Sequence, residues 1–413
     1  MKKVFLMITV TLLAFPLLAS SFQVDGMVRS KAAYRFSQQD LPVQELLVDS
    51  TITHYGDKGA LTIHPMAYLN PNKEAEFDLK EVYVDLYFDN LDLRIGKQTI
   101  IWGEAEGAFI TDLVSPRDMR SFILADFTEI RKAVPAIKAD FYFGNYTLEG
   151  IWVSHHIPST LPEQDSMWAR VPTLFPMEPV VTAPKPLPTD VTHSEFFLSL
   201  GHWGGNLNWT INGGTMYSDE PVITSITLEP SKVRVEQAYE RYSFVGGSMN
   251  TVIGLGVLRL EAALAFDKPM NKIVKQSPPS PPTVSVETHP QLQVLGGFDW
   301  PMFGSQWSAQ YLVTYTHDHH DALYSQMRPV EEVEQTVTLR WQKTYLDELL
   351  TAKVFTYLEL SPLNMLLRPS VSYALGSGVI VEGGFEFFLG KEDGTFGAYF
   401  DNSMMWAALR WYF

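Results

Sequence analysis

Acidic and basic residues are concentrated in one stretch of this chain, between Trp102 and Lys132. The charged residues there are Glu104, Glu106, Asp112, Asp118, Asp126 and Glu129 against Arg117, Arg120, Arg131 and Lys132. If the two groups face each other across a narrow, water-filled space, their field would orient a polar solute that passes between them. If they pair with one another, they only anchor the segment. Both interpretations stay open.

A second group of reactive side chains is His317-Asp-His-His-Asp321. Imidazole nitrogens are common ligands of divalent transition metals, which makes His317, His319 and His320 candidate ligands. Histidines at the end of a loop are also common as solvated surface residues. We therefore assign no metal and no cofactor from the sequence.

Catalytic residues are not identifiable. Thr192-His-Ser194 brings a hydroxyl and an imidazole together only as sequence neighbours, and His317 with Asp318 has no second acidic pair beside it. Nucleophilic catalysis requires a nucleophile, a base and a group that orients the base. The sequence predicts that the protein is not an enzyme.

Three short motifs follow one another near the acidic and basic stretch: Leu93-Arg-Ile-Gly-Lys-Gln98, Trp102-Gly-Glu104 and Ser115-Pro-Arg-Asp118. They resemble the signature of a family of poorly characterised bacterial outer-membrane β-barrels, in which Arg-x-Gly-Arg-Gln leads into Trp-Gly-Glu and Asn-Pro-x-Asp. The resemblance covers residues 91–135 and departs from the family at Lys97 and Ser115. Some members are encoded beside RND-type exporters. The resemblance implies a porin-like barrel, with exporter components as further partners.

The strand that carries the first motif has two faces. Alternation places Asp92, Arg94, Gly96 and Gln98 on one face. We expect Arg94 to point inward and hold Glu104 or Asp118 of the following loop. Gly96 and Gly103 would allow close approach of the backbone. The residues expected to anchor the loop or narrow a pore are Arg94, Gln98, Trp102, Glu104, Glu106, Asp112, Arg117, Asp118 and Arg120. Of these, Trp102 is expected to pack rather than to bind a ligand.

The elements that would position these residues are β-strands. Alternating apolar and polar residues indicate eighteen strands from Phe22 to Phe413, with sixteen as the alternative. Tight turns are predicted at 56–59, 89–90, 144–145, 204–206, 249–250 and 377–378. Long connections are predicted at 102–134, 158–193, 218–234, 267–290, 318–330 and 390–403. Short turns at one end and long loops at the other are typical of a transmembrane antiparallel β-barrel.

The predicted loop at 102–134 follows the fifth strand, where the constriction loop of porins lies. That match is one of topology alone. A short helix is predicted from Asp118 to Glu129, before Pro135. The Pro-rich stretch from Pro158 to Pro188 is expected to form an exposed loop without strands.

Alternation assigns twelve charged residues to the inner face of the barrel. The acidic ones are Glu81, Asp85, Asp92, Glu261, Glu332, Glu334, Glu382 and Glu386. The basic ones are Arg94, Arg259, Arg340 and Arg410. The excess of acidic residues predicts a weak preference for cations.

The two ends of the chain favour the same class. Lys2 and Lys3, an apolar run and small residues up to Ser21 predict a signal peptide over 1–21, which leaves the barrel as 22–413. At the other end Met405, Ala407, Leu409, Trp411 and Phe413 alternate with less apolar positions. The final Trp411 and Phe413 resemble the signal that the barrel assembly machinery reads.

Composition narrows the function further. No apolar stretch after Phe22 reaches 18 residues, so no transmembrane helix is expected. Mean hydropathy is −0.03 while aromatic residues make up 13%. A barrel with an apolar outside and a polar inside accounts for both values. A net charge of −16 disfavours nucleic acid as a partner, and there is no cysteine.

The sequence thus predicts a bacterial outer-membrane channel for passive diffusion of small solutes. Its termini would be periplasmic, and its partners would be lipid and lipopolysaccharide. One alternative, which the family resemblance implies, is an envelope transport barrel for hydrophobic compounds or lipids that works with an inner-membrane exporter. The other is a non-conducting barrel that displays adhesive loops.

Overall fold

The computed structural model describes residues 22–70, 75–103, 110–124, 129–163, 165–169, 179–230, 232–276, 282–325, 328–392 and 394–413. The predicted signal peptide lies outside these residues. The helices within them are the short 3-10 turns η1 (Val191–His193) and η2 (Gly397–Asn402). No helix in these ranges is long and apolar enough to cross a membrane.

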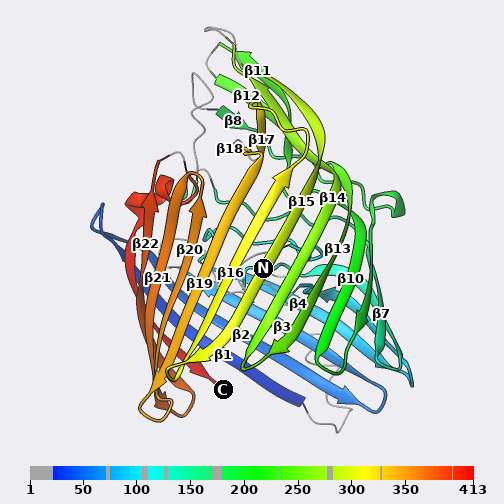
Figure 1. Ribbon diagram of the computed structural model, residues 1–413, viewed down its shortest axis with the longest axis vertical. Coiled ribbons are helices and arrows are strands. Elements are labelled where there is room, and N and C mark those ends of the chain that lie inside the picture. The colour runs from blue at the N-terminus through cyan, green and yellow to red at the C-terminus, as the bar shows by residue number, and fades with distance from the viewer. Residues whose placement is uncertain are drawn as a thin grey trace.

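The described chain forms a closed antiparallel β-barrel (Figure 1). The main sheet has 20 strands, and two of them, β17 (Leu323–Ser325) and β18 (Arg328–Pro329), are short additions outside the wall. The wall strands are β1 (Phe22–Arg35), β2 (Asp40–Gly56), β3 (Gly59–Leu69), β4 (Glu76–Tyr87), β5 (Leu91–Gln98), β6 (Val134–Phe143), β7 (Tyr146–Val153), β9 (Glu195–His202), β10 (Leu207–Tyr217), β13 (Arg241–Ile253), β14 (Gly256–Val274), β15 (Thr283–Met302), β16 (Ser305–Thr316), β19 (Val333–Tyr345), β20 (Leu350–Leu360), β21 (Leu363–Gly376), β22 (Val379–Gly390) and β23 (Met404–Tyr412). These eighteen strands confirm the larger predicted number.

The seam between β1 and β23 closes the ring. Met27 to Arg35 pair with Tyr412 back to Met404. Beyond the strand ends, Gly26 N donates to Phe413 O at 2.9 Å and Phe413 N donates to Gly26 O at 3.0 Å. The C-terminus therefore lies among the short turns, at the lower end of the barrel in Figure 1.

Five of the six predicted tight turns are confirmed, and the turn at Met249-Asn250 is wrong. Both residues lie inside β13, where they pair with Leu260 and Arg259 of β14. The chain reverses at Gly254-Leu255, where Gly254 has a φ of +62°. A tight hairpin needs this left-handed backbone, which glycine adopts without a steric penalty.

Two predicted loops are ordered β-structure instead. Segment 218–234 contains β11 (Val222–Glu229) and the start of β12 (Lys232–Ala238), which form a small sheet with β8 (Pro179–Val181). Segment 267–290 continues the β14–β15 ladder as far as the pair Val274 and Thr283. Apolar side chains from both parts form one cluster beyond the barrel: Ile223, Val233, Val235, Ile273 and Tyr324. Burial of these side chains stabilises the pairing that a solvated loop would not make.

The Pro-rich stretch is also not wholly free of strands. Pro179–Val181, which lies within this stretch, pairs in parallel with β12. Proline can occupy such a site because β8 is an edge strand of the small sheet.

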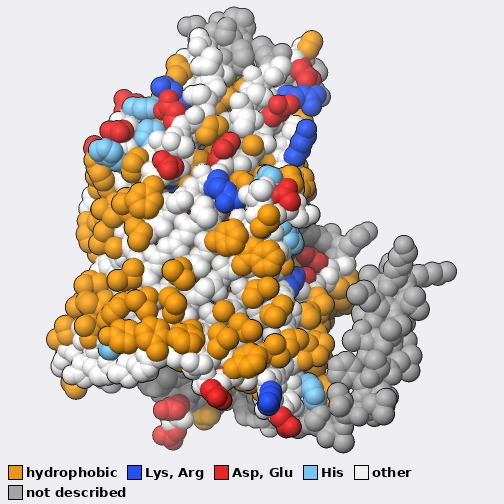
Figure 2. Space-filling model, turned by 90° about the vertical axis from the view of Figure 1, so that its right-hand side faces the viewer, with side chains coloured by type: hydrophobic (Ala, Val, Ile, Leu, Met, Phe, Trp, Pro, Cys, Tyr) orange, Lys and Arg blue, Asp and Glu red, His pale blue; other side chains and the backbone are white. Residues whose placement is uncertain are grey.

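The wall has an apolar outer face and a polar inner face. Leu260, Tyr311 and Leu339 are exposed on the outside, whereas their strand neighbours Glu261, Gln310 and Thr338 are buried inside. Trp300, Trp307 and Trp341 form an outer row with ring centroids 6.3 and 6.4 Å apart. Figure 2 shows apolar side chains over the middle of the barrel and charged ones toward its two ends. This is the distribution that a lipid-spanning barrel requires.

We predict that Gly26→Ala weakens the seam. A Cβ at Gly26 would lie 2.5 Å from Phe413 Cζ and 2.8 Å from Asp49 O. The free energy of unfolding should fall by about 1–3 kcal/mol, measured by denaturant titration of the refolded barrel. Gly150→Ala is the control, since its Cβ would meet nothing within 4 Å. Equal stability of the two variants would contradict this role for Gly26.

Candidate functional site

The segment 99–133, which joins β5 to β6, makes polar contacts with distant parts of the wall. Thr111 donates from its backbone N and its Oγ1 to Glu261 Oε1 on β14, at 2.8 and 2.6 Å. Arg29 on β1 donates to both carboxylate oxygens of Glu129, at 2.6 and 3.0 Å. In the ring of eighteen wall strands, β1 and β14 stand almost opposite each other. One segment therefore contacts two nearly opposite sides of the barrel.

Close packing accompanies these polar contacts. Ile110 is fully buried in a cluster with Ala263 and Leu295, and Leu312 packs against it. Gly103 has a φ of +86°, and a Cβ there would lie 2.6 Å from Glu261 Oε1. The sequence prediction that Gly103 allows close backbone approach agrees with this geometry.

The segment is braced internally by a buried ion pair. Arg131 Nε donates to Asp112 Oδ2 at 2.7 Å, and the exposed fractions of the two residues are 2% and 7%. Asp112 Oδ1 also accepts from the backbone N of Trp102 at 3.0 Å. Ser115 Oγ accepts from Ile100 N at 2.9 Å. These contacts join the two ends of the segment. The charges of Asp112 and Arg131 therefore anchor the segment.

Aromatic packing attaches the segment to a third part of the wall. The ring of Phe122 lies 4.8 Å from that of Tyr399 and 5.7 Å from that of Trp168. Its cluster includes the buried Leu366 of β21 and Phe388 of β22. On β21, Arg368 Nη2 donates to Leu124 O at 3.2 Å. The described residues 118–124 form a β-bridge and turns, so this part of the predicted helix is wrong. Met119 N donates to Thr160 O at 2.8 Å, which joins this part of the segment to the connection that follows β7.

Arg94 was predicted to hold Glu104 or Asp118; it does not hold Asp118, and Glu104 lies outside the described residues. Arg94 Nε donates to Asp85 Oδ1 at 2.7 Å, because Asp85 is its direct cross-strand partner on β4. Asp118 instead accepts from Arg120 Nη2 at 2.6 Å, and Arg120 also reaches Glu76. Glu104, Glu106 and Asp126 lie outside the described residues.

Gln98, Trp102 and Arg117 are the other residues that were predicted to anchor the segment. Gln98 is fully buried, and its Nε2 donates to Ala136 O at 3.0 Å. Trp102 packs edge-on against Phe197, and its Nε1 donates to Glu149 Oε1 at 2.5 Å. Both side chains therefore pack into the wall. Arg117 lies apart from them, with its Nη2 3.9 Å from Glu220 Oε1.

Many of the predicted lumen charges are paired with neighbours. Glu382 pairs with Arg410 at 2.5 Å. Glu386 pairs with Arg368, and Arg259 pairs with Asp299. Glu81 accepts from Thr99 N, and Asp92 from Tyr142 Oη. Glu332 and Glu334 are exposed, Glu332 precedes β19, and Arg340 is half-buried.

Sequence reasoning missed Arg29, Lys138 and Arg368 on the basic side and Glu45, Asp49, Glu149 and Asp299 on the acidic side. Arg29 pairs with Glu45 of β2, and Lys138 with Glu149 of β7. The alternation of β1 could have identified Arg29 as a lumen residue, since Arg29, Lys31 and Arg35 lie at alternate positions on the same face of the strand.

A small charged cavity adjoins the segment. Its volume is about 70 Å³, and Arg117, Asp219, Glu220, Tyr242 and Lys268 contribute to its lining. Burial and the charge of Glu195 raise the pKa of Asp219 well above its ordinary value, although Arg117 opposes them. The cavity is sized for water or an ion rather than for an organic solute.

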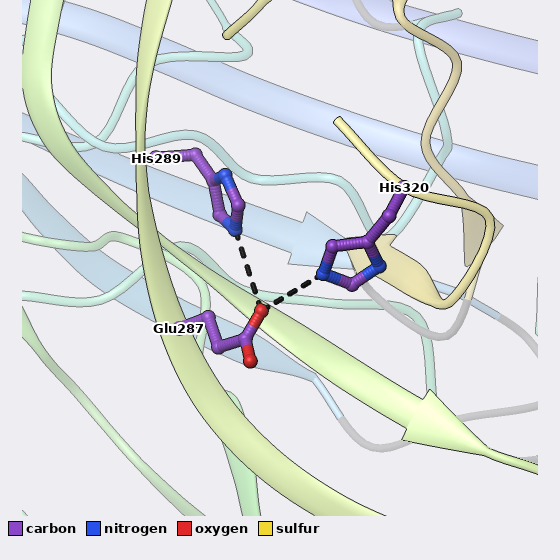
Figure 3. A group of neighbouring side chains, drawn as sticks. All are labelled: Glu287, His289 and His320. Atoms are coloured by element: carbon purple, nitrogen blue, oxygen red, sulfur yellow. Dashed lines mark hydrogen bonds and ion pairs between the residues drawn. The ribbon is translucent and has the colours of Figure 1, made fainter. Parts of the chain in front are cut away.

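Of the three candidate ligands, His320 is the one that joins a group of potential ligands among the described residues. It lies beside Glu287 and His289 of β15, which the sequence analysis missed because they precede His320 by about thirty residues (Figure 3). His317 is exposed, and His319 Nε2 lies 2.7 Å from Val330 O.

Comparison with known proteins gives a family and a fold. Residues 67–352 match the family model described as "Protein of unknown function (DUF1302)". No curated protein is significantly similar in sequence. Among solved structures, OccAB3 of Acinetobacter baumannii is 10% identical with a TM-score of 0.55, over 95% of this chain and 99% of that one.

Two further similar structures come from Pseudomonas aeruginosa. OpdK with vanillate is 8% identical with a TM-score of 0.54, over 95% of this chain and 98% of that one. OccK2 in complex with glucuronate is 9% identical with a TM-score of 0.53, over 96% and 97%. At these identities the likeness shows the fold alone.

We predict that Asp112→Asn loosens segment 99–133. The substitution removes the carboxylate charge that accepts from the buried guanidinium of Arg131, and losing a hydrogen bond to a charged group costs about 1.5–3 kcal/mol. Backbone amides in 110–124 and 129–133 should exchange hydrogen faster, as measured by mass spectrometry. Asp190→Asn is the control, because that carboxylate caps the exposed turn η1 elsewhere. If amides of the segment exchange at the same rate in Asp112→Asn and in Asp190→Asn, the pair of Asp112 and Arg131 does not stabilise the segment.

Proposed function

Because the chain belongs to the family described as "Protein of unknown function (DUF1302)" and folds as an outer-membrane-type barrel, we propose that it is a channel for passive diffusion of small solutes. Its segment 99–133 crosses the lumen and narrows it. The observation that carries this proposal is the pair of contacts from one segment to nearly opposite strands: Thr111 with Glu261 and Glu129 with Arg29. A loop that folded against β5 and β6, the two strands that it joins, would reach neither β14 nor β1.

The orientation follows the usual arrangement of such barrels. Short turns and the C-terminus share one end, and long connections such as 99–133 and 154–194 leave from the other. In bacterial outer-membrane barrels the short-turn end is periplasmic. We therefore assign the termini to the periplasm and the long connections to the outside. There they would meet lipopolysaccharide, and the assembly machinery would read Trp411 and Phe413.

Selectivity in this proposal is a weak preference for cations. Ion pairs such as Glu382 with Arg410 cancel much of the charge that a count of acids would suggest. An acidic surplus still accompanies them, since Asp140 and Glu149 share the single Lys138, and Asp49 and Glu81 share His64. Rings of acidic side chains favour cations in a pore.

Apolar clusters on the inner side of the wall support a second candidate, transport of hydrophobic compounds. One is Ile110 with Ala263 and Leu295, and the other surrounds Phe122. These side chains are buried, so a solute with an aromatic or aliphatic part would contact them, and gain by that contact, only when segment 99–133 moves away from the wall. Vanillate, the aromatic compound that accompanies OpdK in its solved structure, is a sensible first probe of this candidate.

We predict that Glu261→Ala raises the single-channel conductance of the refolded barrel in a planar bilayer at least about twofold, because a released segment widens the constriction. Glu382→Ala is the matched control, since it removes the same side chain from a pair that joins two wall strands. If both variants conduct like the wild type, segment 99–133 is not the constriction. A folded wild type that never conducts would exclude the channel and favour the second candidate or a surface-display barrel.

We also predict a cation-selective reversal potential under a salt gradient, with a permeability ratio of cation to anion of about 2–5. The same bilayer chamber gives this measurement. An anion-selective potential would show that the basic residues outweigh the acidic ones in the pore.

A further inference from the structure

A second group of side chains lies outside the proposed pore constriction. Glu287 and His289 belong to β15, and His320 belongs to the connection that follows β16. They lie beyond the pair Leu292 and Tyr315, on the side away from the Trp300–Trp307 row. The group is therefore at the end of the barrel that carries the long connections, outside the apolar band.

The three side chains converge on one point (Figure 3). Glu287 Oε2 lies 2.9 Å from His320 Nε2 and 3.6 Å from His289 Nε2. One ligand atom from each residue lies within 4.8 Å of the others. The side chain of His289 is 8% exposed, whereas those of Glu287 and His320 are about one-third exposed. The group is thus closed on one side and open to solvent on the other.

The hydrogen bond at the far side of the His289 ring fixes its tautomer. His289 Nδ1 lies 3.1 Å from the backbone carbonyl oxygen of His317. A carbonyl oxygen only accepts, so Nδ1 carries the proton and donates. In the neutral ring the lone pair is then on Nε2, which points toward Glu287. This Nε2 is buried and has no hydrogen-bond partner within the described ranges.

A lone pair that faces a carboxylate is repelled unless a positive charge lies between them. A backbone carbonyl that holds Nδ1–H is also the usual outer partner of a metal-bound histidine. Tetrahedral Zn²⁺ bonds of about 2.0–2.1 Å place ligand atoms roughly 3.3 Å apart. The distances of 2.9 and 3.6 Å lie on either side of that value.

We propose that Glu287, His289 and His320 form a binding site for a divalent transition metal of the Zn²⁺ class, with the fourth position open to solvent. Two imidazoles and one carboxylate favour Zn²⁺, Ni²⁺ or Cu²⁺ over Ca²⁺ and Mg²⁺, which prefer oxygen ligands. Lys272 Nζ donates to Glu287 Oε1 at 2.9 Å, which leaves Oε2 for the metal. The bound ion would clamp the connection 317–322 onto the β14–β15 ladder.

The competing occupant is a proton, since a positively charged His289 or His320 would also pair with Glu287. Direct titration with a metal ion distinguishes the two occupants, because a site that holds only a proton binds no metal. The refolded full chain, without a histidine tag, is titrated with Zn²⁺ by calorimetry and with Co²⁺ by visible absorption. The site should bind one ion per chain, and Co²⁺ should give the intense bands of a tetrahedral or five-coordinate complex.

His289→Ala should weaken Zn²⁺ binding at least about tenfold and abolish the Co²⁺ bands. His317→Ala is the matched control, because His317 contributes only its backbone carbonyl and its side chain is exposed. Heat-dependent migration in electrophoresis verifies that both variants are folded. Absence of binding by the wild type, or equal binding by the two variants, would overturn the proposal and leave a protonated histidine as the partner of Glu287.

Discussion

The β1–β23 ladder is the interaction on which the rest of the structure depends. In a lipid layer every backbone N–H and C=O must bond within the protein, so a sheet is stable there only if it has no free edge. The pairing of Met27–Arg35 with β23, extended by Gly26 and Phe413, removes both edges at once. It also fixes the number of strands and with it the width of the enclosed space.

A wall of eighteen strands encloses more space than its own side chains fill. Two sets of contacts hold the described parts of segment 99–133. The buried pair of Asp112 and Arg131 gives the segment its own shape. The contacts to Glu261 and Arg29 then hold this shape against two sides of the wall.

Local signals were sufficient to predict the strand number and five of the six turns. Alternation and turn chemistry are read over a few residues, and a barrel repeats them. The turn at Met249-Asn250 was predicted wrongly because asparagine carries the same local signal as the glycine that makes the turn. Pairs such as Arg94 with Asp85, or Glu287 with His320, depend on register and on segments far apart in the chain. Neither alternation nor spacing contains that information.

The paired continuation of β14 and β15 has a consequence for access to the barrel. Lys268–Val274 and Thr283–His289 extend the ladder by seven residues beyond its bulge, which corresponds to about 24 Å. A two-stranded ribbon of that length would bend freely, but the small sheet of β8, β11 and β12 packs against it and stiffens it. The mouth is therefore lopsided (Figure 1). The ribbon and the small sheet rise beside one flank of the mouth, where they would hinder the approach of a large particle more than that of a small solute.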